Sequence, residues 1–252
     1  MPLTKSKGNM YEWCTHTHTH LAGECSHKCS YCYVQAMERR WHSGRYAGPL
    51  RLVEAELAVK YGKGKTIFVE HCNDLFAADV PGQWIEVVLA HCYQWPDNEY
   101  VFQTKNPGRY RKYLERMPPR RLLGCTLETT NNVIAERVSK AAPPYHRYLE
   151  MRYMQAHGER VFLTVEPILS GCMSLLAHWC FMIRPEFVNI GADSKGHGLP
   201  EPSAAEVRLL IAELGKLGVP IREKRNLGRL LGMQEKDAGL PTPDAGAGSG
   251  GE

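Results

Sequence analysis

Three cysteines stand close together between residues 25 and 33, in the segment Cys-Ser-His-Lys-Cys-Ser-Tyr-Cys-Tyr. Cys25, Cys29 and Cys32 have the spacing C-x3-C-x2-C, and closely spaced thiolates of this kind are typical of iron–sulfur ligation. Three protein ligands leave one iron of a four-iron cubane open to another molecule, and we expect the chemistry at that iron. The other cysteines are isolated in the sequence: Cys14, Cys72, Cys92, Cys125, Cys172 and Cys180.

Two other interpretations of the cysteine segment are open. A structural zinc site needs a fourth ligand, usually from a second close pair of cysteines or histidines. No second close cysteine pair exists, so zinc would have to use His27 or a histidine upstream of the loop. Alternatively, the three thiols stay reduced and bind no metal. The spacing favours a cluster over both, and we expect His27 to be exposed.

A second group of candidate ligands precedes the cysteines, where His16, His18 and His20 alternate with threonines. In an extended segment all three imidazoles fall on one face. Some metal-dependent barrel hydrolases begin with such a pair, but they also need further ligands. Candidates for these later ligands are His71, His91 and Asp193. We expect the histidines beside the cysteine loop, lining the substrate cavity or orienting the cluster; a metal-dependent barrel hydrolase or a zinc-binding nucleic-acid module is the alternative.

With Tyr31 directly before the third cysteine, the cysteine motif resembles the radical S-adenosylmethionine (SAM) superfamily. Over about residues 10–230 the order of motifs is similar to that of short phage-type radical SAM proteins. The later motifs are Asn73-Asp74-Leu75-Phe76, Gln103-Thr104-Lys105-Asn106-Pro107, Thr126-Leu127-Glu128 and Val165-Glu166-Pro167. The resemblance implies that Cys25, Cys29 and Cys32 hold a [4Fe–4S] cluster and that Tyr31 packs near it. It also implies that SAM chelates the open iron and that an external flavodoxin- or ferredoxin-like donor supplies the electron that cleaves it to a 5′-deoxyadenosyl radical.

Composition sets the class of the chain. Its 252 residues are 43% hydrophobic with a net charge of +4, which is ordinary globular composition. We expect one domain over residues 1–236, with an insertion at about 141–157, and a disordered Gly-, Pro-, Ala- and Ser-rich tail over 237–252. No apolar run predicts a membrane span, and the N-terminus lacks a signal peptide. The odd cysteine count then favours a reducing cytoplasm, that of the host for a phage protein. No feature indicates an oligomer.

Five short apolar runs predict buried parallel strands. They lie at residues 66–69, 100–102, 122–127, 161–165 and 187–190. Helical periodicity follows at 84–91 and 204–217, the latter opened by Ser203 and Glu206 as a capping box. This alternation predicts an α/β fold. With a strand before the cysteines it gives about six βα units, matching the open, partial (β/α)6 barrel with outer helices that the resemblance implies.

Ligands of α/β sheets and barrels bind at the carboxyl ends of the strands, so the polar residues there are the candidates. Asn73 and Asp74 offer acceptors for the ammonium group of SAM, with an Asx turn as the alternative for Asp74. Lys105 can neutralise the carboxylate of SAM or a substrate group, with a solvated loop lysine as the alternative. The loop 191–196 either contacts adenine or the substrate, or is a flexible loop without a ligand; the sequence favours neither role over the other.

Thr126 and Glu128 share one face of a predicted strand, because side chains alternate along strands. Together they suggest contacts to ribose hydroxyls or to the amine of SAM, and Glu166 repeats the pattern on the next strand. A carboxylate inside a barrel mouth is costly unless paired, so a salt bridge within the barrel is the alternative. No residue is singled out as catalytic.

The phage-type resemblance suggests a substrate. Some short radical SAM proteins belong to phage pathways that elaborate thymine in DNA, which implies an isomerase- or mutase-type rearrangement of an amino-acid-modified thymidine. Two basic groups would then contact phosphates, with a merely solvated face as the alternative. They are Arg109, Arg111, Lys112, Arg116, Arg120 and Arg121, and Arg222, Lys224, Arg225 and Arg229.

Overall fold

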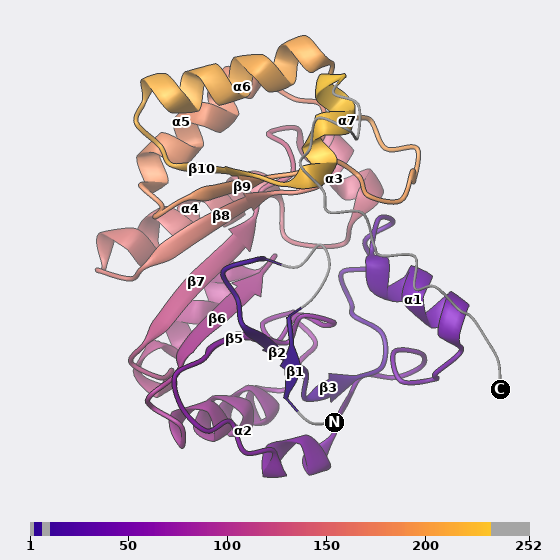
Figure 1. The fold of residues 1–252 in the computed structure, drawn as a ribbon, viewed down its shortest axis with the longest axis vertical. Helices are drawn as coiled ribbons and strands as arrows, with labels where there is room; N and C mark the ends of the chain where they lie inside the picture. Colours follow the sequence, from indigo (N-terminus) through magenta and orange to yellow (C-terminus); the bar gives the residue numbers. More distant parts are fainter. Residues whose placement is uncertain (1–2, 7–10, 233–252) are drawn as a thin grey trace, which may run out of the picture.

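A curved eight-stranded sheet forms the frame of the computed structural model, which describes residues 3–6 and 11–232 (Figure 1). In spatial order its strands are β1 (Thr4–Lys5), β2 (His16–His18), β5 (Thr66–Val69), β6 (Glu99–Thr104), β7 (Arg121–Thr126), β8 (Val161–Val165), β9 (Val188–Ile190) and β10 (Ile221–Glu223). Strands β2 to β10 in this order are parallel, and β1 pairs antiparallel with β2. The carboxyl ends of seven strands therefore meet along one edge.

Helices cover the outer face of this sheet. In Figure 1, α5 (Met173–Ile183) and α6 (Ala204–Lys216) lie along β8 to β10, while α2 (Gly82–Tyr93) lies beside β5 and β6. The remaining helices are α1 (Tyr33–Trp41), α3 (Asn132–Val138), α4 (Pro144–Ala156) and α7 (Gly228–Leu231), with the 3-10 helices η1 (Glu54–Ala58), η2 (Pro107–Lys112), η3 (Leu114–Arg116) and η4 (Arg225–Leu227). A separate hairpin pairs β3 (Leu21–Ala22) with β4 (Arg51–Leu52).

The main hydrophobic core lies between the sheet and its outer helices, where strand and helix side chains such as Ile67, Val88 and Leu176 are fully buried. A second cluster fills the inside of the curved sheet. There the ring centroids of Tyr11 and Trp13 lie 6.0 and 5.4 Å, respectively, from that of Phe162. Residues 11–13 therefore fill part of the space inside the curved sheet. The space at the carboxyl ends of the strands is left for a cavity.

The predicted architecture is confirmed. The five predicted strands are present with small shifts of their ends, the capping box of Ser203 and Glu206 is formed, and the segment 141–157 contains α4. Strand β10 was not predicted, because it is short and carries the charged side chains Arg222 and Glu223. The tail 237–252 and the first two residues lie outside the described residues. Among the described helices, none has the length and hydropathy needed to span a membrane.

Candidate active site at the carboxyl ends of the strands

The cysteine loop joins β3 to α1 and borders a cavity of about 420 Å³. Cys25, Cys29 and Cys32 line it, and so does Cys72, which follows β5. Cys32 is the residue that precedes the first turn of α1, so free backbone N–H groups of that helix face its sulfur. None of the nine cysteines forms a disulfide.

The chemistry of this donor set fits a metal–sulfur centre. Burial raises the pKa of the Cys25 thiol to about 12 and also raises that of Cys32, so thiolates here need a positive partner. Tetrahedral bonds to one zinc ion would set the sulfurs about 3.8 Å apart. Among the described His, Cys, Asp and Glu side chains, the three cysteines are not gathered within 4.8 Å of one another.

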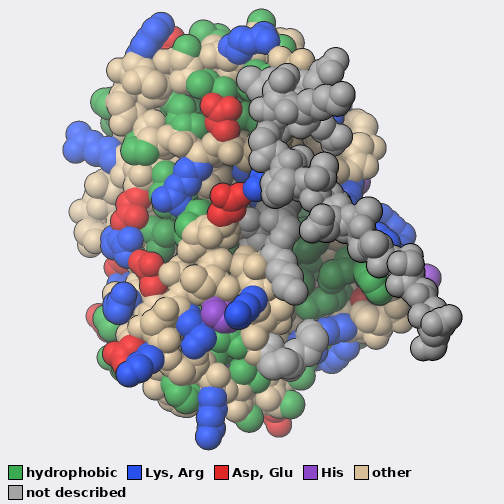
Figure 2. Space-filling view, viewed as in Figure 1, with side chains coloured by type: hydrophobic (Ala, Val, Ile, Leu, Met, Phe, Trp, Pro, Cys, Tyr) green, Lys and Arg blue, Asp and Glu red, His purple; other side chains and the backbone are tan. Residues whose placement is uncertain are grey.

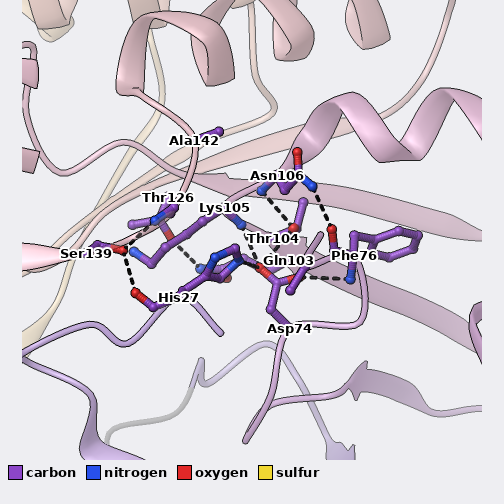
Figure 3. A network of polar contacts seen from close by, with 12 residues as sticks. His27, Asp74, Phe76, Gln103, Thr104, Lys105, Asn106, Thr126, Ser139 and Ala142 are labelled. Atoms are coloured by element: carbon purple, nitrogen blue, oxygen red, sulfur yellow. Dashed lines mark hydrogen bonds and ion pairs between the residues drawn. The ribbon is translucent and has the colours of Figure 1, made fainter. Parts of the chain in front are cut away.

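A buried contact between a histidine and a carboxylate ties the cysteine loop to the sheet (Figure 3). His27 Nε2 lies 2.7 Å from Asp74 Oδ2, which also accepts hydrogen bonds from Thr104 Oγ1 and the Lys105 backbone N–H. The prediction that His27 is exposed is wrong, because its side chain is the one that meets the buried carboxylate. Burial alone would raise the pKa of Asp74, but His27 and the hydrogen bonds hold it below its usual value.

Asp74 also forms the predicted Asx turn, since its Oδ1 accepts the Phe76 backbone N–H at 2.9 Å. Its neighbour Asn73 donates to the Gly23 carbonyl, which lies just before the cysteine loop. Both candidates for the SAM ammonium therefore brace the loop from the end of β5, and their contact with SAM stays a prediction.

Glu128, after β7, is the centre of a second buried network. Arg147 Nη1 donates to Glu128 Oε2 at 2.6 Å and Lys105 Nζ to Oε1 at 2.5 Å, while the Tyr31 hydroxyl also donates to Oε1. Burial favours the neutral acid, but Arg147 and Lys105 together lower the pKa of Glu128 far below its usual value. The salt bridge that sequence reasoning held as the alternative for Glu128 is present; a ligand role for it stays a prediction.

Glu166, after β8, lies instead on a larger cavity of about 620 Å³. Lys224 Nζ lies 3.1 Å from its Oε2, and Asn226 donates to its Oε1. Asn226 Oδ1 is buried with no hydrogen-bond partner among the described residues. A Cβ at Gly191 would stand 2.8 Å from the Glu166 carboxyl group, so only glycine allows this close approach of β9. The Glu166 carboxylate and the Lys224 ammonium both line the cavity, and such charged groups suit a polar ligand.

The floor of this cavity is polar. The Tyr11 hydroxyl donates to Gln103 Oε1 at 2.8 Å and lies 2.8 Å from Thr164 Oγ1, while Gln103 Nε2 donates to Thr126 Oγ1 at 3.0 Å. Its walls are mixed, with 19 lining residues that include aromatic, cationic and carboxylate side chains. They include Tyr31, Tyr33, Phe68, His71, Asp193, Lys195 and Lys224.

The structure thus joins most of the predicted site residues. Tyr31, Lys105 and Glu128 form one network, Thr126 lies beneath it, and the loop 191–196 contributes to the cavity wall. Sequence reasoning missed three residues at this edge, Cys72, Arg147 and Asn226, and it assigned Lys224 to a phosphate-binding group and not to Glu166. The buried carboxylates required cationic partners, but nothing in their spacing told which of the chain's many arginines and lysines would supply them.

The histidine run does not line either cavity. Thr17 faces the larger cavity, so its strand neighbours His16 and His18 face the other way, and His18 and His20 meet His91 of α2 beneath the outer helices. His16 instead contacts Thr15. This buried trio has no access to the barrel mouth, so the geometry does not favour the hydrolase alternative.

Most of the first basic group is engaged away from the cavities. Arg111, Arg116 and Arg121 form ion pairs with Glu150, Glu86 and Glu159, and Arg109 donates to the backbone carbonyls of Ala77 and Val80. In the second group Arg222 stacks on Phe187, and Lys224 alone lines the larger cavity. Figure 2 shows lysines and arginines interspersed with acidic side chains on the visible face, not gathered into one patch.

Comparison with known proteins supports this architecture. A cysteine-to-serine mutant of spore photoproduct lyase superposes with a TM-score of 0.60 at 11% identity, covering 88% of this chain and 80% of that one. Another mutant of that lyase, with bound AdoMet and dinucleoside spore photoproduct, gives 0.54 at 12% identity over 83% of this chain and 63% of that one. SuiB of Streptococcus suis bound to S-adenosylmethionine gives 0.52 at 10% identity over 82% and 50%.

These neighbours are radical SAM enzymes, and the chain shares their partial-barrel fold. It spans less than two thirds of the length of two of them. No curated protein matches the sequence. A family model matches residues 9–193, which is most of the chain. The chain therefore belongs to DUF5131, a family described as proteins of unknown function.

Proposed function

We propose that this protein is a radical SAM enzyme whose [4Fe–4S] cluster is held by Cys25, Cys29 and Cys32. The observation that carries the proposal is the cysteine-lined cavity beside a larger cavity of mixed lining at the carboxyl ends of a partial barrel. The segment 31–34 separates the two, with Tyr31 and Tyr33 on the larger cavity and Cys32 and Val34 on the smaller. A group bound in one is therefore next to a group bound in the other.

Cys25, Cys29 and Cys32 would hold the cluster, which, once reduced by one electron from an external donor, would supply the electron for cleavage of SAM to methionine and a 5′-deoxyadenosyl radical. The chain's own residues fix the geometry. Asp74 and His27 hold the loop, and Lys105 and Glu128 hold Tyr31. Lys224 and Glu166 offer opposite charges for the carboxylate and ammonium groups of SAM.

The larger cavity also bounds the substrate. Its volume of about 620 Å³ falls within the usual range for small-molecule pockets, so it has room for SAM and a substrate group of modest size. Its aromatic side chains suit a planar ring, and Lys5 and Lys195 suit an anion. These features support a nucleobase or nucleotide, and an amino-acid-modified thymidine remains the specific hypothesis, with rearrangement as the reaction.

Anaerobic reconstitution tests the proposal. The protein should bind about four irons and four sulfides, the content of one [4Fe–4S] cluster, and after reduction should convert SAM to 5′-deoxyadenosine and methionine. Cys25→Ala, Cys29→Ala and Cys32→Ala should each remove the cluster. Colourless protein without iron, or iron-loaded protein that never cleaves SAM, contradicts the proposal.

Cys72 provides the matched control, because it lines the same cavity from a different strand end. Cys72→Ala should keep the iron content and the shift of the reduced cluster's EPR spectrum on SAM addition. Loss of the cluster in this variant would mean four protein ligands and no open iron, which contradicts the proposed chemistry.

Comparing nucleoside, single-stranded DNA and duplex DNA as substrates tests the substrate class. Activity on a base flipped out of duplex DNA depends on phosphate contacts, so it should fall strongly as salt is added.

A further inference from the structure

Between β2, the end of η1, the end of β5 and helix α2, a group of histidines is buried away from both cavities. His18, His20 and His91 are 3%, 0% and 2% exposed, and their ligand atoms lie within 4.8 Å of one another. Tyr61, also buried, joins them: its hydroxyl oxygen lies 2.7 Å from His18 Nδ1 and 3.1 Å from His20 Nε2. His20 Nε2 lies 2.9 Å from His91 Nδ1. Four donor atoms from distant segments thus converge.

The outer nitrogen of each imidazole faces an acceptor. His18 Nε2 lies 3.1 Å from Glu56, His20 Nδ1 lies 2.8 Å from Glu70, and His91 Nε2 lies 2.8 Å from the Val59 carbonyl. Both carboxylates also accept hydrogen bonds from other donors, Glu56 from Arg45 and Glu70 from the backbone of His20 and Leu21. Each outer nitrogen must therefore carry the ring proton.

A count of protons shows what the centre lacks. With the ring protons outside, the three inner nitrogens present lone pairs, and the Tyr61 hydroxyl has one proton to give. That proton can serve only one of the two contacts that Tyr61 makes with His18 and His20. The contact between His20 Nε2 and His91 Nδ1 then has no proton to share.

A cation at the centre satisfies every group at once. Metal-bound histidines almost always give their outer ring N–H to a carboxylate or backbone carbonyl, which is the arrangement of all three here. Tetrahedral zinc–nitrogen bonds place ligand atoms about 3.3 Å apart, close to the observed contacts. We propose that His18, His20 and His91, with the Tyr61 hydroxyl as fourth donor, form a structural site for a divalent cation of the zinc type.

The position of this site gives it a structural role. It links the end of β2, which leads through β3 to the cysteine loop, with α2 on the outer layer. All four donor residues are sealed from solvent, so no coordination position is open to a substrate. The proposal is independent of the cluster, because its ligands lie outside the cysteine cavity.

The test removes the cluster first. The full-length triple variant Cys25→Ala, Cys29→Ala, Cys32→Ala, purified without a histidine tag and dialysed, should retain about one zinc per chain by mass spectrometry of the metal. Adding His91→Gln should lower that content at least tenfold. His178→Gln, an exposed histidine on α5, is the matched control and should leave it unchanged. Zinc-free triple variant, or equal zinc in both histidine variants, overturns the proposal.

A second measurement protects the test against misfolding of the His91 variant. Cobalt(II) exchanged into the triple variant should give the intense visible absorption of a tetrahedral site, and Tyr61→Phe should change that spectrum while preserving the ring. Removing the metal with a strong chelator should lower the melting temperature of the triple variant, since a cation that binds only the folded state stabilises it. A weak octahedral cobalt spectrum, or a melting temperature indifferent to the chelator, contradicts the site.

Discussion

The ends of β7 and β8 carry the same pattern, a threonine followed two residues later by a glutamate, yet the two glutamates differ in their surroundings. Thr126 and Thr164 are register partners in the sheet. Two residues on, the Glu128 side chain is 1% exposed between Arg147 and Lys105, whereas that of Glu166 is 17% exposed on the larger cavity. One strand end is completed by the chain itself, and its neighbour leaves polar atoms for a ligand.

The difference follows from what covers each end. Helix α4, which packs against η2, α5 and β8, brings Arg147 to Glu128, where the guanidinium also donates to the carbonyls of Thr126 and Ala142. Glu166 instead meets Lys224, just after β10, and Asn226 of the short 3-10 helix η4. The segment 141–157, whose role the sequence left open, contains α4 and thus closes the first site.

Removing the closed carboxylate should have the largest effect. Glu128→Gln leaves Arg147 as a buried charge without its counter-ion, and breaking such a pair costs about 3–5 kcal/mol. The free energy of unfolding, measured by denaturant titration of the cluster-free protein, should fall by that amount. The double variant Glu128→Gln, Arg147→Met should recover most of it; a double variant as unstable as the single one would contradict a pairwise interaction.

Acid should weaken the same network. The pKa of Glu128 is lower in the folded protein than its ordinary value of 4.5, so its ionisation stabilises the fold above that pH. This contribution is lost as the pH falls below 4.5 toward the folded-state pKa. The stability gap between wild type and Glu128→Gln should therefore narrow by about 2 kcal/mol between pH 6 and pH 3. Parallel stability curves would show that Glu128 is not the group responsible.

At the open strand end the effect should move from stability to binding. Glu166→Gln should change the free energy of unfolding by less than about 1 kcal/mol, because its partners stay accessible to the cavity. On the proposed function it should weaken SAM binding about tenfold, or about 1.4 kcal/mol, by equilibrium titration. Glu136→Gln, an exposed glutamate on α3, should change neither quantity. A Glu166 variant that binds SAM normally but has a much lower free energy of unfolding would contradict the assignment of binding to the end of β8 and of stability to the end of β7.

This contrast marks how far the sequence could predict the molecule. Apolar runs and helical periods depend on local residue order, so the α/β fold and the strand ends that bear Lys105, Glu128 and Glu166 were predictable, while the partial barrel was what the family resemblance implied. The partner of each carboxylate depends on which distant segment packs over it. Sequence order did not indicate that Arg147, rather than one of the other arginines, would reach Glu128, nor that His27 would turn inward to Asp74.

The histidine run teaches the same lesson from the outer layer. Alternation predicted a shared face for the imidazoles, and His18 and His20 do meet, with ring centroids 4.4 Å apart. Their partners Tyr61 and His91 come from segments about 40 and 70 residues away, which no local spacing reveals. The direction of the face, toward α2 and away from the cavity, was set by Thr17 taking the inward position.

One layer below the glutamates the two strands should behave alike, and this is the smallest expected effect. Thr126 accepts a hydrogen bond from Gln103, and Thr164 contacts Tyr11, so a valine at either position removes a polar partner while keeping the shape. Each substitution should cost about 1 kcal/mol, since both neighbours can turn to cavity water. The two losses, measured by denaturant titration, should agree within about 0.5 kcal/mol. A larger difference between the two losses would mean that the strands already differ at the threonines. The effect of α4 would then extend along β7 beyond the ion pair of Arg147 with Glu128.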